Sequence, residues 1–145
     1  MATTGNSIGR WVSVLYRYGQ SFLDRELKMY SISSGQYIFL IILLKRDGMR
    51  QEELSRVLNI DKATTARAVK KLEAAGYVRR TTDPRDKRAR VVYVTNKAVN
   101  IQPVLEEISD KWTDMVTSGF TEEEKKMVID LMKRLSINAA SVVKD

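Results

Sequence analysis

Apolar residues recur at helical spacing near both ends of the chain. In the first part they occupy Ile8, Trp11, Leu15, Tyr18 and Phe22. After position 96 a second series occupies Ala98, Ile101, Leu105, Ile108, Trp112 and Met115. Steps of three and four place each series on one face of a helix, and so narrow a face is typical of a helix that packs on another helix. A last helix follows a capping box at Thr121–Glu124, with Val128, Leu131, Leu135 and Val142 on one side.

Between these series lies a segment that is apolar on every side. It runs from Tyr37 to Leu44 and is the longest apolar run in the sequence. Ser33 or Ser34 is a suitable N-cap for a helix there, and Gly48 is a suitable stop. A helix without a polar side is expected to be central and covered all round. The run is also too short to cross a bilayer, so we expect no membrane partner.

Two shorter helices are predicted next. The first begins at Gln51 and ends before a turn at Asn59–Ile60. Asp61 is a good N-cap for the second, which Gly76 terminates. On a helical wheel of this second helix, the side facing the core holds Thr65, Ala66, Val69 and Leu72. The opposite side holds Ala63, Thr64, Arg67, Lys70, Lys71 and Ala74, and it is either a solvated face or a surface for an anionic partner.

A basic β-hairpin is predicted after the second helix. Tyr77–Thr82 and Ala89–Thr95 are rich in β-branched and aromatic residues, and Met49–Arg50 can add a short extended pairing. The connecting loop Asp83–Arg88 contains a proline and three cations. Two helices followed by such a hairpin predict a winged helix-turn-helix, so the fold class is mainly α with a small β-hairpin wing.

The terminal helices predict the domain organisation. We expect a single domain over residues 1–145, with a winged helix-turn-helix lobe at about 33–95 that binds DNA. Residues of about 1–32 and 96–145 form N- and C-terminal dimerisation helices. The alternative is that both apolar series close an intramolecular bundle.

Charge and composition narrow the function. The net charge is +7, and residues 49–95 hold twelve basic and six acidic side chains, so the middle of the chain favours a polyanion. The sequence has no cysteine and no histidine, which argues against disulfides, zinc fingers and the usual metal sites. No nucleophile–base pair and no phosphate-binding glycine loop is present, so we expect no enzyme, catalytic residue, metal or cofactor. Without a visible secretory signal, a cytoplasmic protein is expected.

The residues from Asp61 to Arg80, DKATTARAVKKLEAAGYVRR, and from Asp83 to Thr95, DPRDKRARVVYVT, resemble the MarR family of winged-helix regulators. The family's wing pattern, D-x-R-D-x-R followed by a β-branched strand that ends in threonine, is filled by Asp83, Arg85, Asp86, Arg88 and Thr95. The resemblance implies a homodimer whose first and last helices interlock and which binds pseudo-palindromic double-stranded DNA. It also implies that Arg85 is the wing-tip arginine that reaches the minor groove.

Roles for the individual side chains follow from groove chemistry. In the second helix we assign Thr64 and Arg67 to base-edge or mixed contacts, and Lys62, Lys70 and Lys71 to phosphates. In the wing, Lys87 and Arg88 are assigned to flanking phosphates. Asp83 and Asp86 would repel DNA, so we expect them to orient the wing arginines. The alternative for any one of these residues is a solvated charge.

The resemblance further implies a small phenolic or anionic effector. Arg17 lies beside two tyrosines of the first helix and could pair with an anion, while Tyr37 and Trp112 could supply aromatic walls. The alternative is an exposed arginine and two core aromatics. The sequence thus predicts a dimeric, sequence-specific transcription regulator, in particular a ligand-responsive repressor. A sequence-tolerant architectural DNA-binding protein is the main alternative, and a winged-helix adaptor for other proteins is a third.

Overall fold

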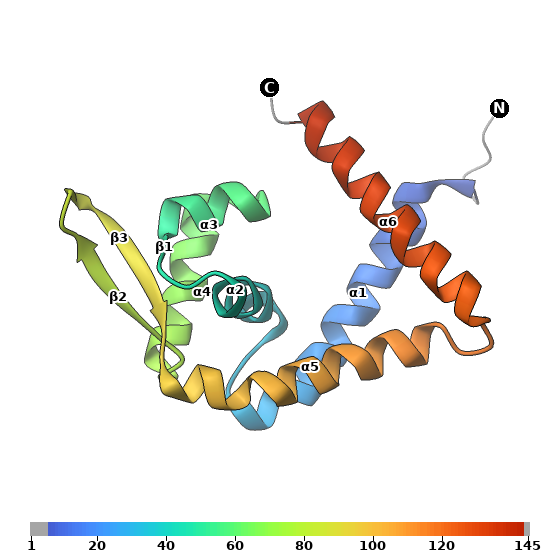
Figure 1. Ribbon diagram of the computed structural model, residues 1–145, viewed down its shortest axis with the longest axis horizontal. Helices are drawn as coiled ribbons and strands as arrows, with labels where there is room; N and C mark the ends of the chain where they lie inside the picture. The colour runs from blue at the N-terminus through green and yellow to red at the C-terminus, as the bar shows by residue number, and fades with distance from the viewer. Residues whose placement is uncertain (1–5, 144–145) are drawn as a thin grey trace. The chain divides into compact units, whose positions relative to one another are not determined.

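The computed structural model describes residues 6–143. Along the chain, the elements of Figure 1 are α1 (Ile8–Leu27), the 3₁₀ turn η2 (Lys28–Tyr30), α2 (Ser34–Lys45), β1 (Met49–Arg50), α3 (Gln51–Leu58), α4 (Lys62–Ala74), β2 (Val78–Asp83), β3 (Asp86–Val94), α5 (Asn96–Val116) and α6 (Glu122–Val143). This order confirms the predicted winged helix-turn-helix class. The ends of the predicted domain, residues 1–5 and 144–145, lie outside the described part.

The chain forms two compact units. The first extends to Ser109 and contains α1 through most of α5, and the second begins at Asp110 and contains the end of α5 and α6. The three strands and the helices α2, α3 and α4 all lie before Ser109, so they belong to the first unit. The predicted division into a DNA-binding lobe and dimerisation helices stays a prediction.

The sheet is antiparallel with strand order β1-β3-β2. Met49 of β1 pairs with Val92 of β3, as the predicted short extended segment requires. The wing loop is shorter than predicted, because β2 and β3 pair as far as Asp83 and Asp86 and leave only Pro84 and Arg85 in the turn. Pro84 presets the backbone for a tight turn. Lys87 and Arg88 therefore lie in strand β3 and not in a loop.

The core of the first unit is built on α2. Phe39, Leu40 and Leu43 are buried, and Leu72 of α4 and Leu105 of α5 are fully buried as well. The expectation that α2 is covered all round is wrong at Ile38, which is 39% exposed. An apolar run shows that much of a helix is buried, but it does not say whether every side chain has a neighbour within the same chain.

The apolar series of α5 divides between two environments. Ala98, Ile101, Leu105 and Ile108 are buried, which places this half of the series in the core of the chain itself. Further along the same series, Trp112 is half-buried and Met115 is exposed. For residues 98–108 this burial favours packing within the chain, which is the alternative left open by the sequence.

Other apolar side chains of the terminal helices are exposed in the single chain. On α1, Trp11, Leu15 and Tyr18 are exposed by about half or more, although Phe22 is buried. On α6, Leu131, Leu135 and Val142 are also exposed, as are Met127, Met132 and Ile137. Exposed apolar faces of this extent are typical of interaction surfaces.

Local signals set several boundaries as predicted. Thr121 and Glu124 form the capping box of α6, with the Thr121 N–H 2.9 Å from Glu124 Oε1 and the Glu124 N–H 3.1 Å from Thr121 Oγ1. Asn59 adopts a left-handed conformation with φ of 52° and makes the turn between α3 and α4. Within residues 6–143 no single helix is long and apolar enough to cross a membrane. Residues Ile8–Tyr30 and Ser34–Lys45 meet that criterion only as a pair bent by 75°.

Candidate nucleic-acid interface

The start of α4 is held by a chain of three polar side chains. Asp61 is the N-cap, and its Oδ1 accepts the Thr64 backbone N–H at 2.7 Å. Its Oδ2 accepts the Thr64 hydroxyl at 2.8 Å, and the Thr64 oxygen in turn accepts a guanidinium N–H of Arg67 at 3.1 Å. The Thr64 amide is the main cause that lowers the pKa of Asp61, so the carboxylate stays charged. This chain fixes Thr64 and Arg67 relative to each other.

The two sides of α4 differ as a DNA-reading helix requires. Thr65, Val69 and Leu72 are fully buried, as predicted. Ala68 is buried too, whereas Ala66, which was predicted in its place, is only half-buried. The opposite side exposes Lys62, Ala63, Arg67, Lys70 and Lys71, with Thr64 partly covered. Of the predicted contact residues of this helix, four are therefore exposed and Thr64 is half-buried.

The wing is fastened by the carboxylate of Asp83, which is buried. Oδ1 accepts the Arg85 backbone N–H at 2.8 Å, and Oδ2 lies 2.7 Å from a terminal guanidinium nitrogen of Arg50. The Arg85 amide, followed by the Arg50 guanidinium, holds the pKa of Asp83 below its usual value. Asp83 was expected to orient arginine side chains of the wing. It holds Arg85 through the backbone N–H and also pairs with Arg50, while the Arg85 side chain is exposed.

Asp86 does hold a wing arginine. Its Oδ1 accepts both the backbone N–H of Arg88 at 3.0 Å and the Arg88 Nε at 3.3 Å. The Arg88 side chain is nevertheless 93% exposed. Asp86 therefore orients Arg88, and the Arg88 side chain stays exposed to solvent.

The base of the wing is tied to α4 and to the start of the lobe. Arg80 of β2 forms an ion pair with Glu73 of α4 at 3.0 Å, and Arg80 is the main cause that lowers the pKa of Glu73. The Tyr77 hydroxyl donates to the Tyr30 carbonyl at 2.6 Å. Lys97 of α5 donates to the Ala75 carbonyl at 2.6 Å. These contacts join the start of the wing and the end of α4 to η2 and α5.

Three further arginines belong to this region without having been predicted: Arg50, Arg80 and Arg90. Arg50 and Asp83 are 33 positions apart, so no local pattern connects them. Arg88 and Arg90 are two positions apart in β3, so their side chains lie on the same face of the strand. This two-residue spacing in a predicted strand is enough to place Arg90 beside Arg88.

The predicted effector residues lie on three helices. Arg17 is exposed on α1, where it lines a shallow hollow of about 280 Å³ together with Val14, Tyr18 and Ser21. Tyr37 is half-buried on α2. Trp112 is half-buried and belongs to the second unit, so the site formed by all three residues stays a prediction. Among the described residues, no group of three or more acidic side chains could hold a metal ion.

Known proteins are similar to this chain in sequence and in architecture. A model of the MarR family matches residues 32–89. The HTH-type transcriptional regulator YybA of Bacillus subtilis is 32% identical over 133 residues, covering 92% of this chain and 89% of that protein. The crystal structure of a MarR transcriptional regulator from Methanosarcina mazei Go1 has a TM-score of 0.92 at 37% identity, covering 94% of this chain and 98% of that one.

A further solved structure contains nucleic acid. It is a MarR family transcriptional regulator from Listeria monocytogenes complexed with a 26mer DNA, with a TM-score of 0.85 and 29% identity over 94% of this chain and 91% of that one. The relatives are transcriptional regulators and not enzymes, as the sequence predicts. With these likenesses over nearly its whole length, the chain belongs to the MarR family of DNA-binding, helix-turn-helix transcriptional regulators.

Proposed function

We propose that the chain acts as a homodimer that binds a pseudo-palindromic operator and represses transcription until a small ligand releases it. The observation that carries this proposal is the accessible cationic face of α4 next to an anchored cationic wing. A helix with small residues near its start and long cations beyond them suits the major groove. The Listeria relative was solved in complex with a 26mer DNA, which supports DNA as the partner of this chain.

Each side chain of that surface has a proposed role. Thr64 and Arg67 contact base edges, because Asp61 holds them together at the exposed start of α4. Lys62, Lys70 and Lys71 contact phosphates. In the wing, Arg85 projects from the two-residue turn and enters the minor groove, where a narrow A·T-rich segment attracts guanidinium. Lys87 and Arg88 follow on β3 and contact the flanking phosphates, with Asp86 orienting Arg88.

The homodimer is supported by the uncovered terminal faces. Trp11, Leu15 and Tyr18 on α1 and Leu131 and Leu135 on α6 are exposed in the single chain. Burial of apolar surface is worth about 25 cal/mol per Å², so covering these faces with a second copy stabilises the assembly. A dimer with two-fold symmetry presents two copies of α4 to two half-sites about one helical turn apart.

The effector role is proposed for Arg17, Tyr37 and Trp112, with a small phenolic or anionic molecule as ligand. Arg17 supplies an accessible positive charge beside Tyr18. Benzoate at millimolar concentration tests this proposal in operator binding and thermal unfolding. Weaker operator binding and a raised melting temperature in the wild type, both lost in Arg17→Gln, are expected. No change in either measurement contradicts the ligand role.

Competition separates this proposal from the architectural alternative. A labelled duplex that carries the operator is bound first, and unlabelled random duplex is then added at increasing concentration. A sequence-specific regulator retains the labelled site in a large excess of random DNA, because specific affinities exceed non-specific ones by about 10³–10⁷. Loss of the label at equal concentrations favours a sequence-tolerant protein.

A further inference from the structure

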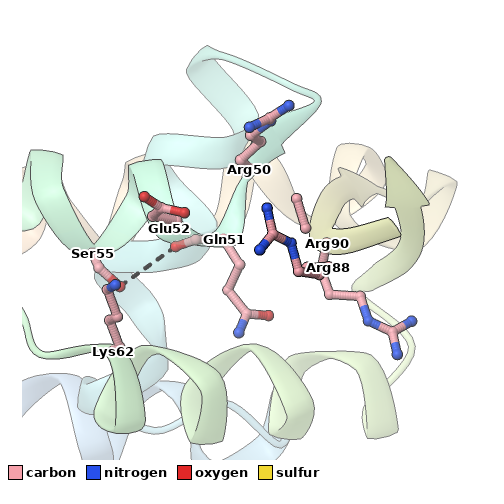
Figure 2. Close-up of a pocket in the computed structure, with 8 residues that line it drawn as sticks. Arg50, Gln51, Glu52, Ser55, Lys62, Arg88 and Arg90 are labelled. Atoms are coloured by element: carbon pink, nitrogen blue, oxygen red, sulfur yellow. Dashed lines mark hydrogen bonds between the residues drawn. The ribbon is translucent and has the colours of Figure 1, made fainter. Parts of the chain in front are cut away.

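A small cavity lies between α3, the start of α4 and strand β3. Its volume is about 160 Å³, and its polar lining includes Gln51, Glu52, Ser55, Lys62, Arg88 and Arg90. Figure 2 shows Ser55 and Lys62 on one side, Arg88 and Arg90 on the other, and the Gln51 side chain between them. The cavity thus joins the positioning helix, the recognition helix and the wing.

The charge of this lining is strongly positive. Lys62, Arg88 and Arg90 bring three cations, Arg50 adds a fourth, and Glu52 is the one acidic residue among the lining side chains. Arg50 forms an ion pair with Asp83, and Arg88 forms a longer ion pair with Asp86. Lys62 and Arg90 form no ion pair within the described part of the chain. Arg90 also acts on the Glu73 carboxyl, whose pKa it helps to lower, but that carboxylate is already paired with Arg80, so both cations can still face an anion.

The volume restricts what the anion can be. About 160 Å³ exceeds the share of several waters, at about 30 Å³ each, but is below the 300–1,000 Å³ of ordinary small-molecule sites. A single phosphate group fits this size, whereas an aromatic acid or a nucleobase would need a larger and less polar space. The cavity therefore suits a compact oxyanion.

The neutral side chains of the cavity are suited to the same ligand. The buried Ser55 hydroxyl makes only a long hydrogen bond of 3.4 Å to the Gln51 carbonyl, which a stronger acceptor can replace. Within residues 6–143, the Gln51 side-chain oxygen is buried without a hydrogen-bond partner. The amide of this lining residue also carries an NH₂ group that can donate. An anion would thereby gain two neutral donors besides the cations.

We propose that this cavity seats one backbone phosphodiester of the bound duplex, held by Lys62, Arg90, Ser55 and Gln51. This inference rests on the proposed DNA-binding function and extends the interface beyond α4 and the wing tip. Lys62 is the first residue of α4 and Arg88 belongs to the wing, so a DNA strand that touches both passes the mouth of the cavity. Such a contact fixes the register of the protein on the duplex without reading sequence.

The test compares Arg90→Gln with Arg56→Gln in equilibrium binding at several salt concentrations. Arg56 is exposed on α3 and does not line the cavity, so it is a matched control. Arg90→Gln is expected to weaken binding to operator and random duplexes alike, by roughly tenfold. It should also make the slope of log K against log salt shallower by about 0.9. Arg56→Gln should change neither quantity, and both variants should unfold at the temperature of the wild type.

The other outcomes overturn the inference in distinguishable ways. An unchanged salt slope in Arg90→Gln, or a loss confined to the operator, contradicts a phosphate contact while the wild-type protein still binds DNA. Failure of the wild type to bind any duplex overturns the proposed function as well. Inorganic phosphate, compared with chloride at equal ionic strength, tests a free anion. If it raises the melting temperature of the wild type but not of Arg90→Gln, while the salt slopes for DNA are equal, the cavity serves a free oxyanion and not the duplex.

Discussion

The Arg50 guanidinium lies 2.7 Å from the carboxylate of Asp83, 33 positions later in the chain. Arg50 immediately precedes α3, and Asp83 ends β2 at the turn of the wing. The same carboxylate accepts the Arg85 backbone N–H. One buried acidic group therefore fastens the wing turn to the body of the lobe.

Asp83→Ala should release the wing while the helical core stays folded. Without the carboxylate, the Arg85 amide and the Arg50 guanidinium lose their shared acceptor, and the turn samples more conformations. Weaker binding to all duplexes and faster amide exchange at residues 85–88 are expected, with exchange in α2 unchanged. Asp86→Ala is the control, since it frees only Arg88. Equal exchange in the wing of Asp83→Ala and wild type would show that the ion pair does not hold the turn.

Arg67→Ala should reduce operator affinity much more than affinity for random DNA. A base-edge contact is worth about 1–3 kcal/mol of discrimination, and Thr64 holds the Arg67 guanidinium at the exposed start of α4. Titration of both duplexes at one salt concentration measures the difference. Lys70→Ala serves as the comparison, because a phosphate contact weakens both duplexes equally. Equal losses for Arg67→Ala would contradict its base-reading role.

Stability should depend on pH in the acid range. The pKa values of Asp61, Glu73 and Asp83 are lowered by amide and guanidinium donors in the folded chain. A folded pKa below the unfolded one stabilises the protein above the unfolded pKa, and this contribution is lost as pH falls through the folded pKa. With no histidine in the chain, we expect a nearly constant free energy of unfolding from about pH 5.5 to 8 and a decline below about pH 4.

Denaturant unfolding at a series of pH values measures this dependence. The variant that carries both Asp61→Asn and Asp83→Asn should be less stable than wild type at neutral pH. It should also lose less stability on acidification, since two of the three stabilised carboxylates are gone. A transition between pH 6 and 7 in the wild type would contradict the assignment.

Dimerisation should depend on the exposed apolar faces of the terminal helices. Leu15→Asp on α1 and Leu131→Asp on α6 place a charge where the second copy is proposed to pack, so either change should produce monomers at micromolar concentration in sedimentation equilibrium. Val57→Asp is the control, because Val57 is comparably exposed but lies on α3. A wild-type chain that sediments as a monomer would overturn the dimer.

The sequence predicts where helices begin when a nearby side chain caps the helix. Asp61 and Thr121 begin helices because their side chains accept backbone N–H groups within the next three residues. The length of the wing turn depends on the pairing of Asp83 with Asp86, which composition does not reveal. The apolar series of α5 shows what spacing alone cannot predict, namely which surface the helix packs against. Its spacing is the same whether the partner is the chain's own core, as for Leu105, or another molecule.

Selection of bound duplexes from a random pool tests the central claim most directly. A dimer that reads DNA through two copies of α4 and two wings should enrich a symmetric site, with half-sites whose centres lie about 10 base pairs apart. The same selection with Arg67→Ala should lose preference at the base that Arg67 contacts in each half-site. Enrichment of a single, asymmetric half-site, or of no sequence at all, would contradict a dimeric, sequence-specific regulator.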